Sequence, residues 1–222
     1  MPDYISATNG RGELLVVPRD IVEAAKPVCE TYLYVGPDNC NPVRELGDGQ
    51  VSVASSAARY NPAFYWLIGT PSLGFNGTQA LYVMRVVGAL LSSLLIGLAA
   101  WSISLWSRSF WPLLGLLVAL TPVAIYSTAV AAPNGLEIAA GVALWASLIG
   151  LSSPGIAPRV EGVLLRTAIP SAVVLAGVRQ LGPLWIVLIV FSTAALLGVR
   201  GTVGVFRRHA ARFCHRGQSL AG

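Results

Sequence analysis

A series of apolar runs between residues 80 and 199 constrains the fold of this chain most strongly. The hydrocarbon core of a bilayer needs about 20 mostly apolar residues per helix. Five runs approach or reach that length, at about residues 80–106, 110–130, 134–151, 160–178 and 183–199. Charged residues make up 11% of the chain, less than half of the roughly 25% that is typical of soluble domains. The sequence therefore predicts an all-α membrane protein with about five transmembrane helices.

The runs differ in quality. The first is the strongest, and its "GALLSSLLIGLAA" stretch is rich in the small residues that allow helices to pack closely. Pro122 is expected to kink the second run, because neighbouring helices can accommodate such a break. The fourth run is the weakest, since Arg166, about one turn into its helix, and Pro170 interrupt it.

Charge is distributed unevenly along the chain. Residues 1–48 hold eight acids and four bases, whereas the remainder holds two acids and eleven arginines. These arginines mostly flank apolar runs, so we interpret them as topology signals and expect no nucleic-acid partner. Five arginines and no acid in residues 200–222 predict a cytoplasmic tail. Counting back through the spans 80–199 then places residues 1–79 outside, as an extracytoplasmic segment.

The N-terminal segment raises a question of its own. Its start, "MPDYISATNGRGELL", has neither the basic nor the apolar region of a signal peptide. We therefore expect a transmembrane span before Met1, in a chain that is a fragment or has a misassigned start. The alternative is a native protein whose N-terminus reaches the exterior by another route.

Two cysteines of the outer segment lie 11 positions apart. Cys29 and Cys40 flank a turn-forming "GPDN" sequence, and outside the cell such a pair can form a disulfide. Two unpaired thiols are the alternative. No histidine accompanies the cysteines at metal-ligand spacing, so we expect no metal there and no cofactor is evident.

The "RYNPAFYWLIG" stretch predicts a short aromatic helix. Asn61 suits its N-cap and Pro62 its first turn, and the following aromatic run is too short to span a bilayer. Tryptophan and tyrosine favour the headgroup layer, so this helix is expected to lie along the outer membrane surface. Arg59, Tyr60 and Asn61 at its start form either part of a plain anchor or an anion-binding site.

Four segments together resemble a known family. "SSAARYNPAFYWLIGTPSL", "ALYVMRVVGALLSSLLIGLA", "AAPNGLEIAAGVALW" and "VRQLGPLWIVL" occur in an order and spacing similar to those of the multi-pass membrane proteins called domain of unknown function 2142. The resemblance implies a bacterial plasma-membrane protein similar to GT-C glycosyltransferases, with a polyprenyl-phosphate sugar as donor and a cell-envelope glycan as acceptor. It also implies an acidic pair as catalytic base, and this chain has no such pair in its outer segment. The catalytic residue is therefore unknown, as is any requirement for a divalent metal.

Asn134 and Glu137 begin the third apolar run. An N-cap Asn with Glu three residues later forms a capping box, and Glu in a first turn also suits the helix dipole. The other interpretation is that Glu137 contacts an acceptor hydroxyl or pairs with an arginine. Both can hold at once.

Two further arginines are candidates for binding the donor phosphate, together with Arg59. Arg85 lies near the outer edge of the first span, where it either grips phosphate or extends to the headgroups. Arg179 lies on the expected outer side, against the positive-inside rule. Guanidinium suits phosphate because its planar fork matches phosphate geometry. The alternative to an enzyme is a transporter, a polysaccharide-export accessory or a degenerate relative.

Overall fold

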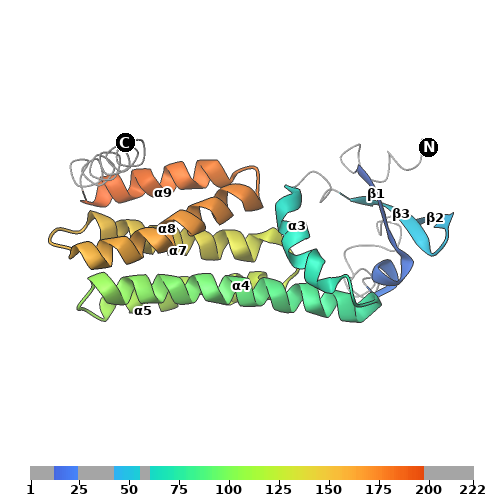
Figure 1. Ribbon diagram of the computed structural model, residues 1–222, viewed down its shortest axis with the longest axis horizontal. Helices are drawn as coiled ribbons and strands as arrows, with labels where there is room; N and C mark the ends of the chain where they lie inside the picture. The colour runs from blue at the N-terminus through green and yellow to red at the C-terminus, as the bar shows by residue number, and fades with distance from the viewer. Residues whose placement is uncertain (1–12, 25–42, 56–60, 198–222) are drawn as a thin grey trace, which may run out of the picture. The chain divides into compact units, whose positions relative to one another are not determined.

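The computed structural model describes residues 13–24, 43–55 and 61–197. Its chain divides into two compact units, Met1–Gly88 and Ala89–Gly222, which are considered separately (Figure 1). Cys29, Cys40, Arg59 and Tyr60 lie outside the described residues. The disulfide and the roles suggested for Arg59 and Tyr60 therefore stay predictions.

The first unit contains a three-stranded antiparallel sheet that we did not predict. Its strands are β1 (Glu13–Pro18), β2 (Val43–Gly47) and β3 (Gln50–Ser55), in the order β1-β3-β2. A two-residue turn joins β2 to β3, and Asp48 and Gly49 in it have φ of 52° and 70°. Positive φ at both positions is what a type I′ hairpin turn requires. Residues 1–79 thus contain more than the loop with a short helix that we expected.

The aromatic helix forms where the sequence predicts it. Helix α3 (Pro62–Gly69) is followed by the 3-10 turn η3 (Thr70–Ser72), and Pro62 occupies its first position. The Asn61 side-chain oxygen accepts a hydrogen bond from the Ala63 N–H at 3.0 Å, which confirms the predicted cap. Phe64 and Ile68, one turn apart, are both only 2% exposed. Placement of this helix at a membrane surface stays a prediction.

Helix α4 (Gly77–Trp106) begins slightly earlier than the apolar run that predicted it. The Gly77 N–H donates to the Asp20 Oδ2 at 2.6 Å, so a carboxylate 57 residues upstream caps the helix. A negative charge at a helix N-terminus is favourable because unpaired N–H groups and the helix dipole meet there. Arg85 consequently lies two turns inside α4, where one turn was expected.

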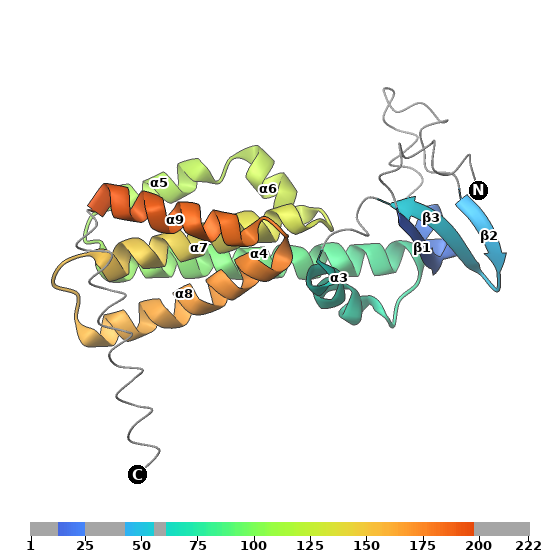
Figure 2. The ribbon, with the colours of Figure 1, turned by 90° about the horizontal axis from the view of Figure 1, so that it is seen from above.

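The remaining helices belong to the second unit. They are α5 (Trp111–Ala119), α6 (Pro122–Ala129), α7 (Pro133–Ser152), α8 (Pro158–Val178) and α9 (Gly182–Leu197). Helix α7 packs against α6, α8 and α9 (Figure 2). The prediction of an all-α membrane protein is confirmed, with the small sheet as an addition in the first unit.

Fewer helices meet the length of a span than we predicted. Among the described residues, α4, α7 and α8 are long and apolar enough, and the α5–α6 pair would make a fourth. The described part of α9 has 16 residues, fewer than the roughly 20 that a span needs. The described part of the chain therefore supports three or four spans, where five were expected.

The two prolines within apolar runs behave differently. Pro122 starts α6 after a break from α5, the two axes are bent by 64°, and Thr121 caps α6 (Figure 2). The predicted kink is thus a full interruption. Pro170 lies inside α8, and the helix continues through it, although proline has no N–H to donate to a carbonyl of the preceding turn. Arg166 lies two turns into α8, one turn deeper than expected, because the helix already begins at Pro158.

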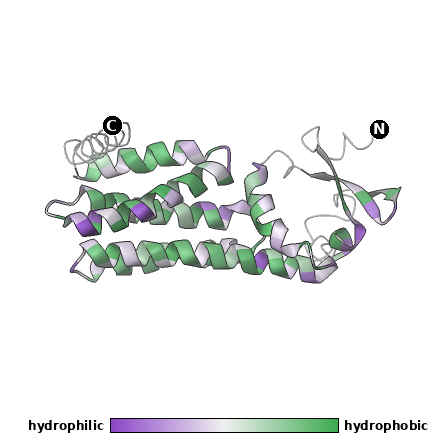
Figure 3. Cartoon of the chain, viewed as in Figure 1, coloured by the Kyte–Doolittle hydropathy of each residue, from purple (hydrophilic) through white to green (hydrophobic). Residues whose placement is uncertain are grey.

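Small residues form the interior of the second unit, and large apolar ones cover its surface. Ala139, Ala140 and Ala143 of α7 are fully buried. The Ser102 and Ser147 hydroxyls meet at 3.2 Å between α4 and α7. Val173 and Phe191 are exposed by 67% and 70%, and apolar colour dominates the helices in Figure 3. This pattern is typical of helices that pack through small residues and present bulky ones to lipid.

Candidate functional site

Three of the residues singled out in the sequence meet at one end of the second unit. Arg179 Nη1 donates to Glu137 Oε2 at 3.0 Å and to Asn134 Oδ1 at 3.2 Å. The residues come from the start of α7 and the end of α8, 42 and 45 positions apart in sequence. We call Asn134, Glu137 and Arg179 the polar cluster.

Helix geometry places the two acceptors side by side. Asn134 and Glu137 are three residues apart on α7, so their side chains project from the same face. Arg179 follows the last residue of α8 with an extended backbone, φ −141° and ψ 156°. Its carbonyl accepts from the Gly182 N–H at 3.0 Å. This tight turn between α8 and α9 fixes the backbone position from which the Arg179 side chain projects.

Two glycines allow the backbone to close around the polar cluster. A Cβ on Gly182 would overlap the carbonyl oxygen of Leu175, seven residues earlier in the chain. A Cβ on Gly135 would overlap the carbonyl oxygen of Ser127 at the end of α6. Both obstacles are backbone atoms, so neither can rotate away. Glycine is therefore required on either side of the cluster.

The polar cluster is mostly withdrawn from solvent. The Glu137 side chain is 11% exposed and that of Arg179 29%. The second carboxylate oxygen, Glu137 Oε1, is buried and has no hydrogen-bond partner among the described residues. Buried polar atoms usually have partners, and an unpaired one costs about 1–3 kcal/mol. The site thus keeps one strong acceptor for a donor group that is not part of the described chain.

The predicted capping box is wrong. Helix α7 begins at Pro133, its N-cap is Ala132, and no side chain caps it. Proline favours the first helical position, where its missing N–H is not needed, and this shifts Asn134 to the second position. Glu137 therefore lies in the second turn. The other interpretation, pairing with an arginine, is confirmed.

Comparison with known proteins gives the chain a family. The family described as "Predicted membrane protein (DUF2142)" matches residues 44–214, which is most of the sequence. The chain belongs to the DUF2142 family. No curated protein and no solved structure matches it. The resemblance identified from four sequence segments is thereby confirmed at the level of the family, which is described as a membrane protein without a stated activity.

The other predicted site residues that the structure describes in this DUF2142 chain belong to the first unit. Asn61 belongs to the first unit, and its side-chain oxygen is used in capping α3. Arg85 is exposed on the part of α4 in that same unit. Its predicted phosphate contact stays a prediction. Among the described residues, no group of His, Cys, Asp or Glu could hold a metal ion.

Sequence reasoning missed a cavity in the first unit of the DUF2142 chain. Asp20, together with residues of α3, η3 and the start of α4, lines a space of about 510 Å³. The aromatic residues of that wall were noticed, but only as an anchor. Asp20 could not be connected with them because its partner Gly77 lies 57 residues later in the chain.

Proposed function

We propose that this DUF2142 protein takes part in transferring a sugar from a polyprenyl-phosphate donor to a cell-envelope glycan at the outer face of the plasma membrane. The polar cluster of Asn134, Glu137 and Arg179 binds the sugar phosphate. One observation carries the proposal: a carboxylate oxygen that has no partner among the described residues is buried beside an arginine at the end of an apolar helix bundle.

The chemistry of the polar cluster suits a phosphorylated sugar. A carboxylate accepts hydrogen bonds from sugar hydroxyls, and Glu137 Oε1 has this capacity unused among the described residues. A guanidinium attracts phosphate. Asn134 offers an amide whose oxygen already accepts from Arg179. Hydroxyl and phosphate recognition thus come from adjacent side chains.

Stability alone gives little reason for an ion pair at this place. Removing two charges from water costs several kcal/mol per ion, and apolar residues of similar size are often equally stable or better. A charged pair within an apolar bundle is therefore a favourable position for recognising a polar ligand. Catalysis itself is not assigned to any residue of this chain.

A second candidate, transport, is favoured by one feature. Transporters often bind their substrates where a membrane helix is interrupted, and α5 and α6 form such a broken pair. The break at Leu120 and Thr121 carries no charge, however, whereas the polar cluster lies on α7 and α8. The cluster therefore supports sugar transfer better than transport.

Replacing Glu137 with glutamine tests the proposal. Glu137→Gln keeps an oxygen for Arg179 but removes the negative charge that strengthens bonds to ligand hydroxyls. We expect kcat/KM for transfer of radiolabelled sugar from polyprenyl phosphate to glycan to fall about 10- to 100-fold, the loss of one charge-assisted hydrogen bond. The assay uses membranes that contain the full-length protein.

The matched control is Glu23→Gln, the same exchange in an exposed carboxylate that pairs with Arg19 on the surface of the first unit. It should leave transfer unchanged. Full activity of Glu137→Gln would reduce the polar cluster to a structural role. A wild-type protein that transfers no sugar from any polyprenyl-phosphate donor would contradict the proposed function itself.

A further inference from the structure

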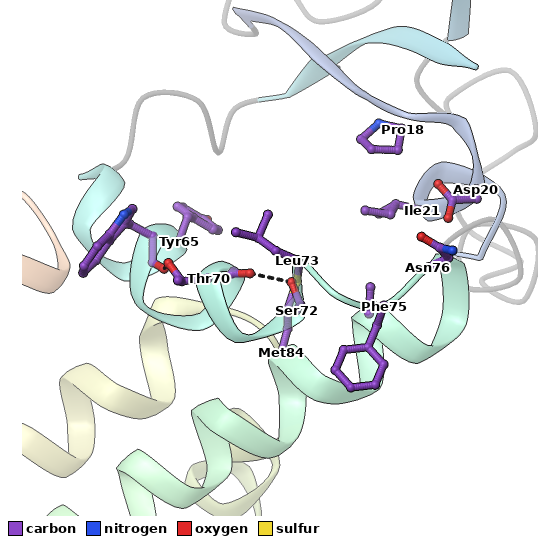
Figure 4. A pocket seen from close by; sticks show the side chains of 13 residues that line it. Pro18, Asp20, Ile21, Tyr65, Thr70, Ser72, Leu73, Phe75, Asn76 and Met84 are labelled. Carbon is purple, nitrogen blue, oxygen red and sulfur yellow. Dashed lines mark hydrogen bonds between the residues drawn. The ribbon is translucent and has the colours of Figure 1, made fainter. Parts of the chain in front are cut away.

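A cavity of about 510 Å³ lies within the first unit. Three aromatic and several polar side chains line it, among them Tyr65, Trp66, Phe75, Asp20, Thr70 and Asn76. Figure 4 shows Pro18, Asp20 and Ile21 on one side of the cavity and Tyr65, Thr70 and Leu73 across from them. Its volume is typical of small-molecule sites, which span about 300–1,000 Å³.

Contacts within the first unit hold the walls of the cavity in place. Asp20 binds the Gly77 N–H at the start of α4. The Ser72 hydroxyl donates to the Gly69 carbonyl at 2.7 Å, which tightens the turn after α3 (Figure 4). The buried ring of Phe64 meets the Tyr65 ring edge to face, with centroids 5.3 Å apart. The site is therefore formed before any ligand arrives.

The charges of the lining restrict what the cavity can bind. Among the described residues, Asp20 is the one charged side chain that lines it, and no lysine, arginine or histidine does. An anionic ligand would meet the negative charge of Asp20 and no cationic side chain among the described lining residues, so phosphates and uronic acids are disfavoured. Neutral ligands with hydroxyl donors are favoured, because a carboxylate accepts their hydrogen bonds.

The remaining lining groups suit a sugar ring. The Asn76 side chain makes no hydrogen bond within the described residues, so its amide can both donate and accept. The Thr70 hydroxyl donates to the Trp66 carbonyl at 2.6 Å and keeps its acceptor capacity. Aromatic rings offer flat apolar faces to the C–H groups of a pyranose. The aromatic rings can pack on the flat faces of a saccharide ring, while the Asp, Asn and Thr side chains can bind the hydroxyl groups at its edge.

We propose that this cavity binds a neutral saccharide of one or two pyranose units. Its rings pack against the aromatic wall, and its hydroxyls bond Asp20 and Asn76. Identifying this saccharide with the glycan acceptor rests on the proposed function, but the binding itself does not.

A glycine in the cavity wall provides a blocking variant. Gly69 lines the cavity, its φ of −79° suits any residue, and a Cβ there meets nothing within 4 Å. Gly69→Leu therefore fills the space without straining the backbone. Gly74→Leu is the matched control, because Gly74 also has open space around it but does not line the cavity.

Binding is measured by saturation-transfer NMR on the full chain in neutral nanodiscs. The probes are the methyl glycosides of glucose, mannose and galactose, the disaccharides maltose and cellobiose, and glucuronate. We expect at least one neutral probe to bind more strongly than glucuronate. Gly69→Leu should abolish that signal, Trp66→Ala should weaken binding about tenfold or less, and Gly74→Leu should leave it unchanged.

Three results would overturn the inference: no neutral probe binds, glucuronate binds best, or Gly69→Leu binds as well as the wild type. The two proposals fail separately. Saccharide binding without any sugar transfer would leave the cavity assignment intact and refute the proposed function. Sugar transfer without saccharide binding in this cavity would support the proposed function and refute the cavity assignment.

Discussion

At the scale of single residues, one guanidinium nitrogen organises the polar cluster. Arg179 Nη1 serves both Glu137 and Asn134, and this leaves Glu137 Oε1 without a partner in the described part of the chain. A fully buried carboxylate that loses its cation costs about 3–5 kcal/mol. Here the Arg179 side chain is 29% exposed, so water screens part of the interaction.

The first prediction at this scale concerns stability. Arg179→Ala should lower the free energy of unfolding by roughly 2 kcal/mol, less than for a fully buried pair. Unfolding is followed thermally in nanodiscs. Arg166→Ala is the control, because Arg166 is exposed on the same helix and should change stability little.

A double-mutant cycle separates the ion pair from general damage. Because Arg179 and Glu137 are in direct contact, Arg179→Ala and Glu137→Ala should together destabilise the protein by less than the sum of the two changes. Strict additivity would show that the pair contributes nothing to folding, and the observed 3.0 Å contact would then lack energetic consequence.

At the scale of helices and strands, local composition predicted that an element forms better than it predicted where the element begins and ends. Long apolar runs predicted α4, α7 and α8, and Asn61-Pro62 predicted the start of α3. The start of α4 escaped prediction because its cap, Asp20, is remote in sequence. The predicted capping box at Asn134 was wrong because Pro133 occupies the first helical position. Caps that depend on tertiary contacts or on a competing neighbour are not visible in a short motif.

The small sheet was not predicted for a different reason, because a sequence pattern typical of a hairpin is present. Asp48-Gly49 before the alternating "QVSVAS" is a typical hairpin sequence, but β3 also pairs with β1, which ends 32 residues before it. Of the candidate site, the sequence pointed to Asn134, Glu137 and Arg179 separately. Their meeting depends on the packing of α7 on α8, which no local pattern encodes.

The prediction at this scale concerns the turn between α8 and α9. Gly182→Ala places a methyl group on the Leu175 carbonyl oxygen, so the turn must shift and move Arg179 away from Glu137. We expect a lower unfolding temperature and a smaller Arg179–Glu137 coupling in the double-mutant cycle.

Gly177→Ala is the matched control for this change. Gly177 lies in α8 with open space around it, so alanine should be neutral or stabilise the helix by about 0.5–1 kcal/mol. If Gly182→Ala were equally well tolerated, the tight turn would not be what positions Arg179.

At the scale of the whole molecule, sidedness in the membrane connects the site with its substrate. Helix α8 has 21 residues, about 31 Å at 1.5 Å per residue, which matches a bilayer core of about 30 Å. If α8 spans the bilayer, the turn at residues 153–157 and the turn that holds Arg179 lie at opposite membrane surfaces. Five spans with the arginine-rich tail inside, the arrangement that the sequence predicts, would have α9 cross the membrane and would place the Arg179 turn at the exterior, where polyprenyl-phosphate sugars would meet the growing glycan.

Cysteine labelling on cells tests this placement most directly. Leu181 and Ala157 are exposed at the two ends of α8, and each is changed to cysteine in a chain whose three native cysteines are replaced by serine. We expect a membrane-impermeant maleimide to label Leu181→Cys on intact cells, and Ala157→Cys only after permeabilisation. Labelling of Ala157→Cys but not Leu181→Cys on intact cells would place the polar cluster in the cytoplasm and contradict sugar transfer at the outer surface.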